Sequence, residues 1–285
     1  MFYDRFLLQF FCLTGFTLSS FFAIGATPAL AATLSNSTAF LRLEKFSILP
    51  LNPSADSNRE AIAFTGNSES IAEADADGTL TVSLEATERV IESDFASSVT
   101  GSGRDYFSVG VAESFASSSF LVPANEILSF DFTASLSLEN TTDSILDGSV
   151  NSFGNLSFFL FDDINNLSLG SFEAIANLDS NLAADIDNDF VFAESNLDVE
   201  LTSFAKEEMF SGDRELASVN IVGNIQHTFT EATQARLQVK TFNVSCIQAP
   251  KTNDPCFQQV PEFNSIKALL MTFGGCIVLY KVKKA

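Results

Sequence analysis

Tryptophan is absent from this sequence, histidine occurs once and tyrosine three times, whereas phenylalanine occurs 30 times. Trp and Tyr rings are the usual platforms for sugars because they join an apolar face to a polar edge, so their scarcity disfavours a glycosidase cleft. The single histidine, His227, is the one candidate general base. No G-x-S-x-G nucleophile motif accompanies it, and we interpret it as an ordinary strand residue. We therefore predict a protein that is not an enzyme.

Cations are also scarce. Residues 33–262 hold 10 Lys and Arg against 35 Asp and Glu, a net charge of 10 − 35 = −25. Affinity for phosphate requires clustered Lys and Arg side chains. The composition therefore excludes nucleic acid as an expected partner, and it favours a soluble body with a loose affinity for cations.

Cysteine is limited to four residues, of which Cys12 and Cys276 lie in apolar terminal segments. Cys246 and Cys256 flank a short loop, and no histidine or further cysteine is at hand to complete a zinc site. A pair of cysteines in an oxidising compartment indicates a structural disulfide. A loop of this length would stabilise the fold by about 2–3 kcal/mol.

The N-terminal segment 1–31 has the pattern of a secretory signal peptide. Arg5 precedes a mostly apolar run, which ends in the small-residue sequence Ala29-Leu30-Ala31-Ala32. Signal peptidase requires small side chains just before the cut. We predict cleavage after Ala31 or Ala32 and export through the inner membrane, with a retained N-terminal anchor as the alternative.

The C-terminal segment 260–285 has a tripartite pattern. Val260-Pro261-Glu262 comes first, residues 268–280 carry no charge, and Lys281, Lys283 and Lys284 follow. A membrane-spanning helix needs about 20 residues, a length reached if residues 263–266 join the apolar run and Lys267 extends to the interface. Terminal lysines stay on the cytoplasmic side. The pattern predicts a membrane anchor, and a buried C-terminal helix or strand is the alternative.

This arrangement resembles the PEP-CTERM sorting signal of surface and extracellular proteins of Gram-negative bacteria, in which a Pro-Glu-Pro motif precedes one hydrophobic helix and a basic cluster. The resemblance covers residues 260–285 together with the signal peptide. It implies recognition and processing by an exosortase and delivery to the cell surface. This chain departs from the pattern at Phe263, where the motif has proline, and in using Lys where Arg is more usual.

The middle of the chain alternates between apolar and polar residues, as in Phe130, Phe132 and Ala134 with Asp131 and Thr133 between them. A period of two is typical of strands with one buried face. Many short strands with polar turns predict an all-β fold, a single antiparallel β-sandwich that is jelly-roll-like. A signal helix and a C-terminal hydrophobic helix are expected to flank it.

The expected divisions are a signal peptide (1–31), an irregular lead-in with a first strand at 39–46 (33–67), the sandwich (68–247), a linker with the disulfide loop (248–259) and the sorting segment (260–285). Within the sandwich we expect turns at Asp77-Gly78 and Gly223-Asn224 and a loop at 97–104. A bulge is expected near Thr241, where the apolar parity switches, and a helix is the alternative for 172–184.

Two acidic clusters contain the oxygen ligands that Ca²⁺ prefers. One consists of Glu73, Asp75 and Asp77, and the other of Asp185, Asp187 and Asp189. Neither places Glu where an EF-hand requires it, and solvated acidic loops are the alternative.

The function predicted from the sequence is that of an exported, non-enzymatic protein of the cell surface or extracellular matrix with a C-terminal membrane sorting signal. No cofactor is expected apart from candidate Ca²⁺. The alternatives are a Ca²⁺-assisted module that binds extracellular polysaccharide and, less favoured, a secreted hydrolase.

Overall fold

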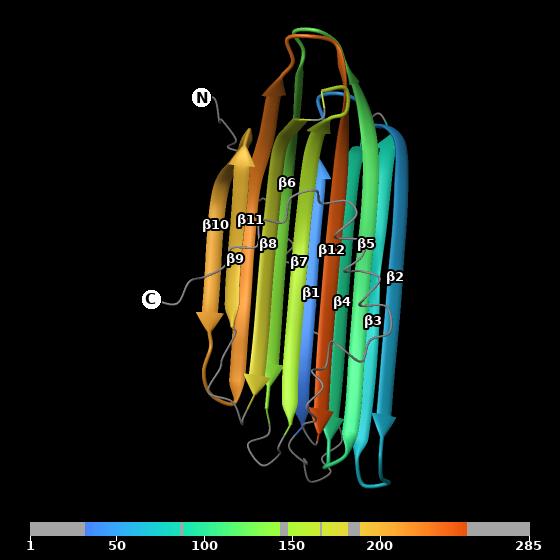
Figure 1. Cartoon of the computed structure of the whole chain (residues 1–285), viewed down its shortest axis with the longest axis vertical. Helices are drawn as coiled ribbons and strands as arrows, with labels where there is room; N and C mark the ends of the chain where they lie inside the picture. Colours follow the sequence, from blue (N-terminus) through green and yellow to red (C-terminus); the bar gives the residue numbers. More distant parts are fainter. Residues whose placement is uncertain (1–31, 86–87, 143–147, 166, 182–188, 250–285) are drawn as a thin grey trace, which may run out of the picture.

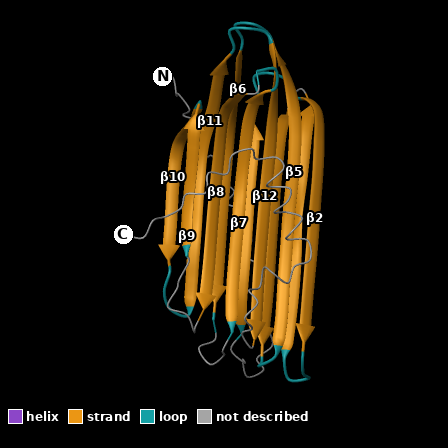
Figure 2. Cartoon of the chain, viewed as in Figure 1, coloured by secondary structure: helices purple, strands orange, loops and turns teal. Residues whose placement is uncertain are grey.

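The structure is a computed structural model and describes residues 32–85, 88–142, 148–165, 167–181 and 189–249. Every regular element in these ranges is a β-strand (Figures 1 and 2). The described part of the chain contains no helix long and apolar enough to cross a membrane. The predicted signal helix and C-terminal helix lie outside the described residues.

The strands are β1 (Thr33–Glu44), β2 (Leu51–Thr65), β3 (Ile71–Glu85), β4 (Glu88–Ser102), β5 (Tyr106–Val122), β6 (Ile127–Thr141), β7 (Ser149–Asp162), β8 (Leu167–Asn181), β9 (Phe190–Leu197), β10 (Val199–Met209), β11 (Arg214–Thr228) and β12 (Thr233–Ala249).

The strands form two six-stranded antiparallel sheets that face each other. Sheet A has the order β10-β11-β6-β1-β4-β3, and sheet B has the order β2-β5-β12-β7-β8-β9. In Figure 1 the long strands run along the vertical axis, with β9 and β10 at one side and β2 and β3 at the other. The expected all-β class and antiparallel pairing are confirmed, and the arrangement is sandwich-like.

Alternation along the strands explains which side chains enter the space between the sheets. On β6, Leu128, Phe130, Phe132 and the even-numbered residues onward are buried, while the odd-numbered residues are half-buried or exposed. On β7, apolar residues occupy both faces, as in Phe158 and Phe159, and this strand lies inside sheet B between β12 and β8. A continuous apolar run is typical of a central strand.

The segment 33–67 is not an irregular lead-in. The strand expected at 39–46 overlaps β1, which begins earlier, at Thr33, and β2 follows it. β1 pairs with β4 and β6 inside sheet A. Ser35 and Ser37, near its start, are polar, yet both are fully buried and face the interior. Pro53 lies on β2, an edge strand, at a register shift between Leu51 and Ser54, which is where a strand tolerates proline.

Two glycines expected in turns lie inside strands instead. A Cβ atom added at Gly78 would lie 2.3 Å from the ring of Phe95, and one added at Gly223 would lie 2.6 Å from the carbonyl oxygen of Glu200. Both positions need glycine because a neighbouring group already occupies the space of a side chain.

Two other expectations are also wrong, the loop at 97–104 and the bulge near Thr241. Residues 97–102 belong to β4 rather than to a loop. The helix considered as an alternative for 172–184 is absent from its described part, because residues 172–181 belong to β8. β12 runs without a register shift past Thr241 in its pairing with both β5 and β7. The change of apolar parity there has another cause, because from Thr241 onward both faces of β12 are buried.

Candidate functional site

Polar side chains cross the space between the sheets in a row that we call the serine seam. Its members come from β1, β4, β5, β7 and β12, and each is at most 3% exposed. They are Ser35, Ser37, Ser93, Ser97, Ser114, Ser152, Thr241, Asn243 and Ser245. Buried hydroxyl and amide groups are costly unless each finds a hydrogen-bond partner, so their partners decide what the seam does.

The partners lie on the opposite sheet. Ser93 of sheet A forms a closed triangle with Ser114 and Thr241 of sheet B, with each pair of hydroxyl oxygens 2.7 Å apart. Asn243 accepts from the Ser37 hydroxyl at 2.7 Å and donates to the carbonyl oxygen of Phe95 at 2.8 Å. The seam therefore consists of hydrogen bonds that join one sheet to the other.

The seam also brings the two backbones close together. The Ser35 hydroxyl donates to the carbonyl oxygen of Asn151 at 2.7 Å, and the Ser245 hydroxyl donates to that of Ser97 at 2.9 Å. A serine side chain is short, so a hydroxyl that reaches the facing backbone indicates a spacing below the ~10 Å typical of stacked sheets. At Gly110, an added Cβ would lie only 2.6 Å from the Asp75 carbonyl oxygen.

At one end of the seam, Asn140 on β6 holds three strands together. Its amide nitrogen donates to the carbonyl oxygens of Val150 and Leu178, both at 3.3 Å, and to the Ser180 hydroxyl at 3.0 Å. Ser180 in turn donates to the buried carboxylate of Glu215 on β11. A carboxylate in this position gains hydrogen bonds that offset part of the cost of its burial.

His227, the one candidate general base, lies on β11. Its Nδ1 atom pairs with the carboxylate of Asp198 at the β9–β10 turn, and its ring makes a T-shaped contact with Phe229 at a centroid distance of 4.5 Å. The pair with Asp198 joins the β9–β10 turn to β11.

The first acidic cluster lies on β3, the edge strand of sheet A. Glu73, Asp75 and Asp77 alternate with half-buried residues and point to solvent. Same-face residues on a strand are about 7 Å apart, whereas oxygen ligands of Ca²⁺ lie 2.3–2.6 Å from the ion and so about 5 Å or less from one another. Asp77 pairs with Arg59 of β2 at 3.1 Å. On neighbouring β4, partial burial raises the pKa of Asp94, and the carboxylates of Glu92 and Asp77 raise it further.

Asp189 is the described member of the second cluster; Asp185 and Asp187 lie outside the described residues. The Asp189 carboxylate accepts from the backbone amide of Asp179 at 2.6 Å, at the start of β9. Within the described ranges, no three His, Cys, Asp or Glu side chains are placed to hold a metal ion. The calcium sites stay a prediction.

The other predicted site residues divide between described and undescribed parts of the chain. Ala32 is exposed just before β1, and Cys246 is fully buried on β12. The cleavage residues Ala29 and Ala31, the partner Cys256, the motif Val260-Pro261-Glu262 and the lysines Lys281, Lys283 and Lys284 lie outside the described residues. The disulfide and the sorting motif stay predictions.

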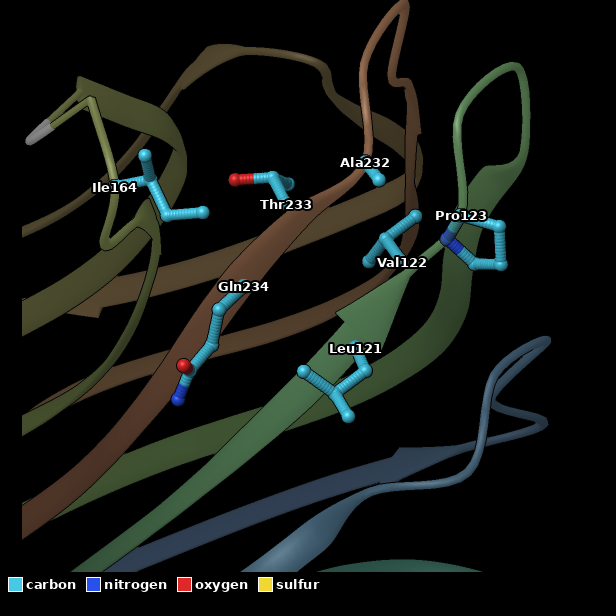
Figure 3. A pocket seen from close by; sticks show the side chains of 7 residues that line it. All are labelled: Leu121, Val122, Pro123, Ile164, Ala232, Thr233 and Gln234. Atoms are coloured by element: carbon cyan, nitrogen blue, oxygen red, sulfur yellow. The ribbon is translucent and has the colours of Figure 1, made fainter.

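A hollow of about 400 Å³ lies at the end of sheet B where β5 ends and β12 begins. Figure 3 shows Leu121 and Pro123 on one side of it and Ile164, from the β7–β8 turn, on the other. The hollow is lined mostly by apolar groups and is open to solvent.

Next to the hollow, Asp162 closes the β7–β8 turn. Its Oδ1 atom accepts from the Thr233 hydroxyl at 2.8 Å and from the backbone amides of Ile164 at 2.9 Å and Asn165 at 3.1 Å. Burial raises the pKa of this carboxyl group, but the hydrogen bonds from Asn165, Thr233 and Ile164 outweigh burial and lower it overall. Asp162 therefore stabilises the fold above the carboxyl's ordinary pKa, and this contribution is lost as the pH falls through the folded-state pKa.

Sequence reasoning missed the serine seam because it assigned serine to the solvent face of each strand. One pattern could have revealed it. Thr241, Asn243 and Ser245 continue the parity of the buried residues Leu237 and Val239, so a strand that runs on without a bulge keeps them inside.

Comparison with known proteins finds no matching family model, no similar curated protein and no similar solved structure.

Proposed function

We propose that this chain is an exported, non-enzymatic protein of the cell surface or extracellular matrix. In this proposal, segment 1–31 directs export and segment 260–285 associates with the membrane, where an exosortase-type enzyme processes it. The mature body is a single jelly-roll-like β-sandwich between these two helical ends. The observation that carries the proposal is the tripartite tail, with an uncharged run at 268–280 between Pro261-Glu262 and three lysines.

The described body supports a scaffold role in two ways. Its interior holds a cluster of phenylalanine rings among aliphatic side chains, together with the serine seam, where hydroxyl groups are engaged with one another. Its surface is strongly acidic, which keeps a displayed protein soluble and monomeric at high local concentration.

The experiment compares the full chain with a chain that ends at Glu262, both expressed in a Gram-negative host and fractionated. We expect the full chain in the membrane fraction and the shortened chain in the soluble exported fraction. A full chain with Lys281, Lys283 and Lys284 changed to Gln separates the basic cluster from the apolar run. The proposal is wrong if the full and shortened chains both appear in the same soluble fraction.

Export is tested separately at the small residues. Changing Ala29 and Ala31 to Gln should block cleavage, because Gln is too large for the peptidase pockets. The uncleaved protein should therefore keep the mass of residues 1–31. A matched change of Ala23 to Gln, upstream of the cut, should leave cleavage intact. Equal masses for the A29Q/A31Q variant and the unchanged protein would contradict the predicted signal peptide.

A further inference from the structure

The outer face of sheet B carries a group of apolar side chains that we call the outer patch. It consists of Val109 and Val111 on β5 and Phe242, Val244 and Cys246 on β12, with Ile62, Phe107 and Phe153 packed beside them. Their direction follows from their neighbours in the chain. Gly110 lies against Asp75 of sheet A, and Asn243 and Ser245 bond to sheet A, so the residues between them point away from sheet A.

The patch is covered although it lies on an outer face. Val244 and Cys246 are 0% exposed, and Val109 is 2% exposed. Four and ten residues beyond Val111 on the same face of β5, Phe115 is 40% exposed and Leu121 is 62% exposed. Side chains on an open sheet face are normally as exposed as Phe115 and Leu121. None of the twelve described strands packs over the outer face of sheet B, so no described strand covers the patch.

The chain itself supplies a candidate cover. β12 ends at Ala249 (lower end in Figure 1), and residues 250–285 continue from this point. The stretch 250–262 has only three charged residues and includes Phe257 and Val260, which have the apolar character that the patch would accept.

Cys246 gives the direction in which this stretch must run. Its thiol side points to the outer face, together with Phe242 and Val244, and Cα atoms joined by a disulfide lie within about 7 Å. Ala249 lies about 10 Å beyond Cys246 along the strand. The seven residues from Ala249 to Cys256 span up to about 25 Å, which is enough for a turn and a return path. A Cys246–Cys256 bond would therefore place Phe257 directly over the patch.

We propose that residues 250–262 fold back over sheet B and dock on the outer patch, held there by a Cys246–Cys256 disulfide. The apolar face of β12 is then an intramolecular docking site, and this explains why its apolar residues change parity without a bulge. Docking concerns the junction between body and tail, so it does not depend on whether the uncharged run 268–280 enters a membrane.

The test uses the full chain with the photo-cross-linking residue p-benzoylphenylalanine in place of Phe257, irradiated in cells and analysed by peptide mass spectrometry. We expect intramolecular adducts on the peptides that contain residues 107–111 or 242–246. Adducts that join two copies of the chain, adducts with lipid, or adducts confined to residues 1–31 would each overturn the proposal.

A matched pair of variants on β5 gives the specificity control. Val111→Asp places a charge inside the patch and should lower the yield of these adducts by more than about tenfold. Phe115→Asp, on the exposed part of the same face, should leave the yield unchanged. Val111→Thr keeps the branched shape and should lower the yield less, which preserves the test if the Asp variant fails to fold. Equal yields in all three variants would contradict docking.

The disulfide is read from the same samples without the photo-reaction. Digestion without reductant should release one peptide pair that joins Cys246 to Cys256, and reduction should separate it. A linkage of Cys246 to any other cysteine, or an unlinked Cys246, would overturn the proposed tether.

Discussion

The interior of this protein has two regions built on different chemistry. Around β6, β7 and β8, six phenylalanine rings pack in a cluster with centroid distances of 4.8–5.8 Å. These rings are Phe46, Phe120, Phe130, Phe132, Phe158 and Phe172. In the second region, where β1 and β4 face β5, β7 and β12, the space between the sheets is narrow and holds the serine seam.

The difference shows that two sheets can be joined by the packing of large apolar side chains or by hydrogen bonds. The phenylalanine cluster gains its stability from buried apolar area and from ring packing. A hydrogen bond in the seam adds only about 0.5–1.5 kcal/mol net. Each seam hydroxyl, however, meets a particular partner across the gap, so the seam defines how the sheets are placed relative to each other.

The largest effect is expected in the phenylalanine cluster. Phe158→Ala removes a fully buried ring that packs on Phe130, Phe132 and Phe172. The free energy of unfolding, measured by urea denaturation, should fall by about 3–5 kcal/mol. The control, Phe159→Ala, removes a half-buried ring on the other face of β7 and should cost clearly less. Equal losses would show that the cluster is not the centre of the core.

A smaller but clear loss is expected where the sheets are closest. Gly110→Ala places a methyl group against the Asp75 carbonyl oxygen, and backbone atoms yield less easily than flexible side chains. We expect the free energy of unfolding to fall by about 1–3 kcal/mol. Ser117→Ala, on the outer face of the same strand, should have little effect. A stable Gly110→Ala protein would mean that the narrow spacing is not required.

The hydrogen bonds of the seam are expected to contribute less to the free energy of unfolding. Their contribution depends on whether every hydroxyl group of the triangle keeps its partners. Ser93→Ala leaves the hydroxyls of Ser114 and Thr241 one partner short and should lower the free energy of unfolding by about 1 kcal/mol. Replacing all three residues, with Ala at 93 and 114 and Val at 241, should recover most of the loss because no polar group remains unpaired. The opposite result would be a triple variant whose loss in the free energy of unfolding equals the sum of the losses of the three single variants. That result would contradict the expectation that the cost comes from unpaired hydroxyl groups.

The smallest effect is expected on the outer face of sheet B, at Lys240. Burial lowers the pKa of this lysine, and the nearby carboxylates of Glu113 and Glu173 only partly oppose it. The unfolded chain therefore binds more protons than the folded one between the folded-state pKa and 10.5, and stability should rise with pH across this window. Lys240→Met should remove that rise and stabilise the protein at pH 7 by less than about 1 kcal/mol. Thermal melting at pH 7 and pH 10 measures the rise with pH and the stabilisation at pH 7. A Lys240→Met protein with the same pH dependence as the unchanged protein would contradict the claim that burial lowers the pKa of Lys240.

Much of the strand content could be predicted from local pattern. The alternation at Phe130, Phe132 and Ala134 determines a strand and its buried face, and the apolar run from Leu156 to Phe161 indicates a central strand. Both follow from the period of two, which is a property of the chain alone. The extent of the strands could not be predicted in this way, because Gly78 and Gly223 have turn chemistry and only a neighbouring ring or backbone reveals why they lie inside strands.

The candidate sites divide in the same manner. The acidic row Glu73, Asp75 and Asp77 points to solvent, as the alternation implies. The sequence shows that the carboxylates share one face, but the distances between them follow only from the extended strand on which they lie. The serine seam was missed because serine on a strand ordinarily faces water. Its burial depends on the closeness of a second sheet that is distant in the sequence.

By itself, the sequence determined the class of the fold, the acidic surface and the buried face of each regularly alternating strand, because all three depend on composition and on the local geometry of an extended chain. Only the tertiary structure decided that a row of serine, threonine and asparagine side chains would lie between the sheets and that β12 would be buried on both faces from Thr241 onward. Those outcomes depend on which strands meet across the sandwich and how closely they approach. Hydroxyl groups are favourable inside a protein only where a facing partner lies within hydrogen-bond distance.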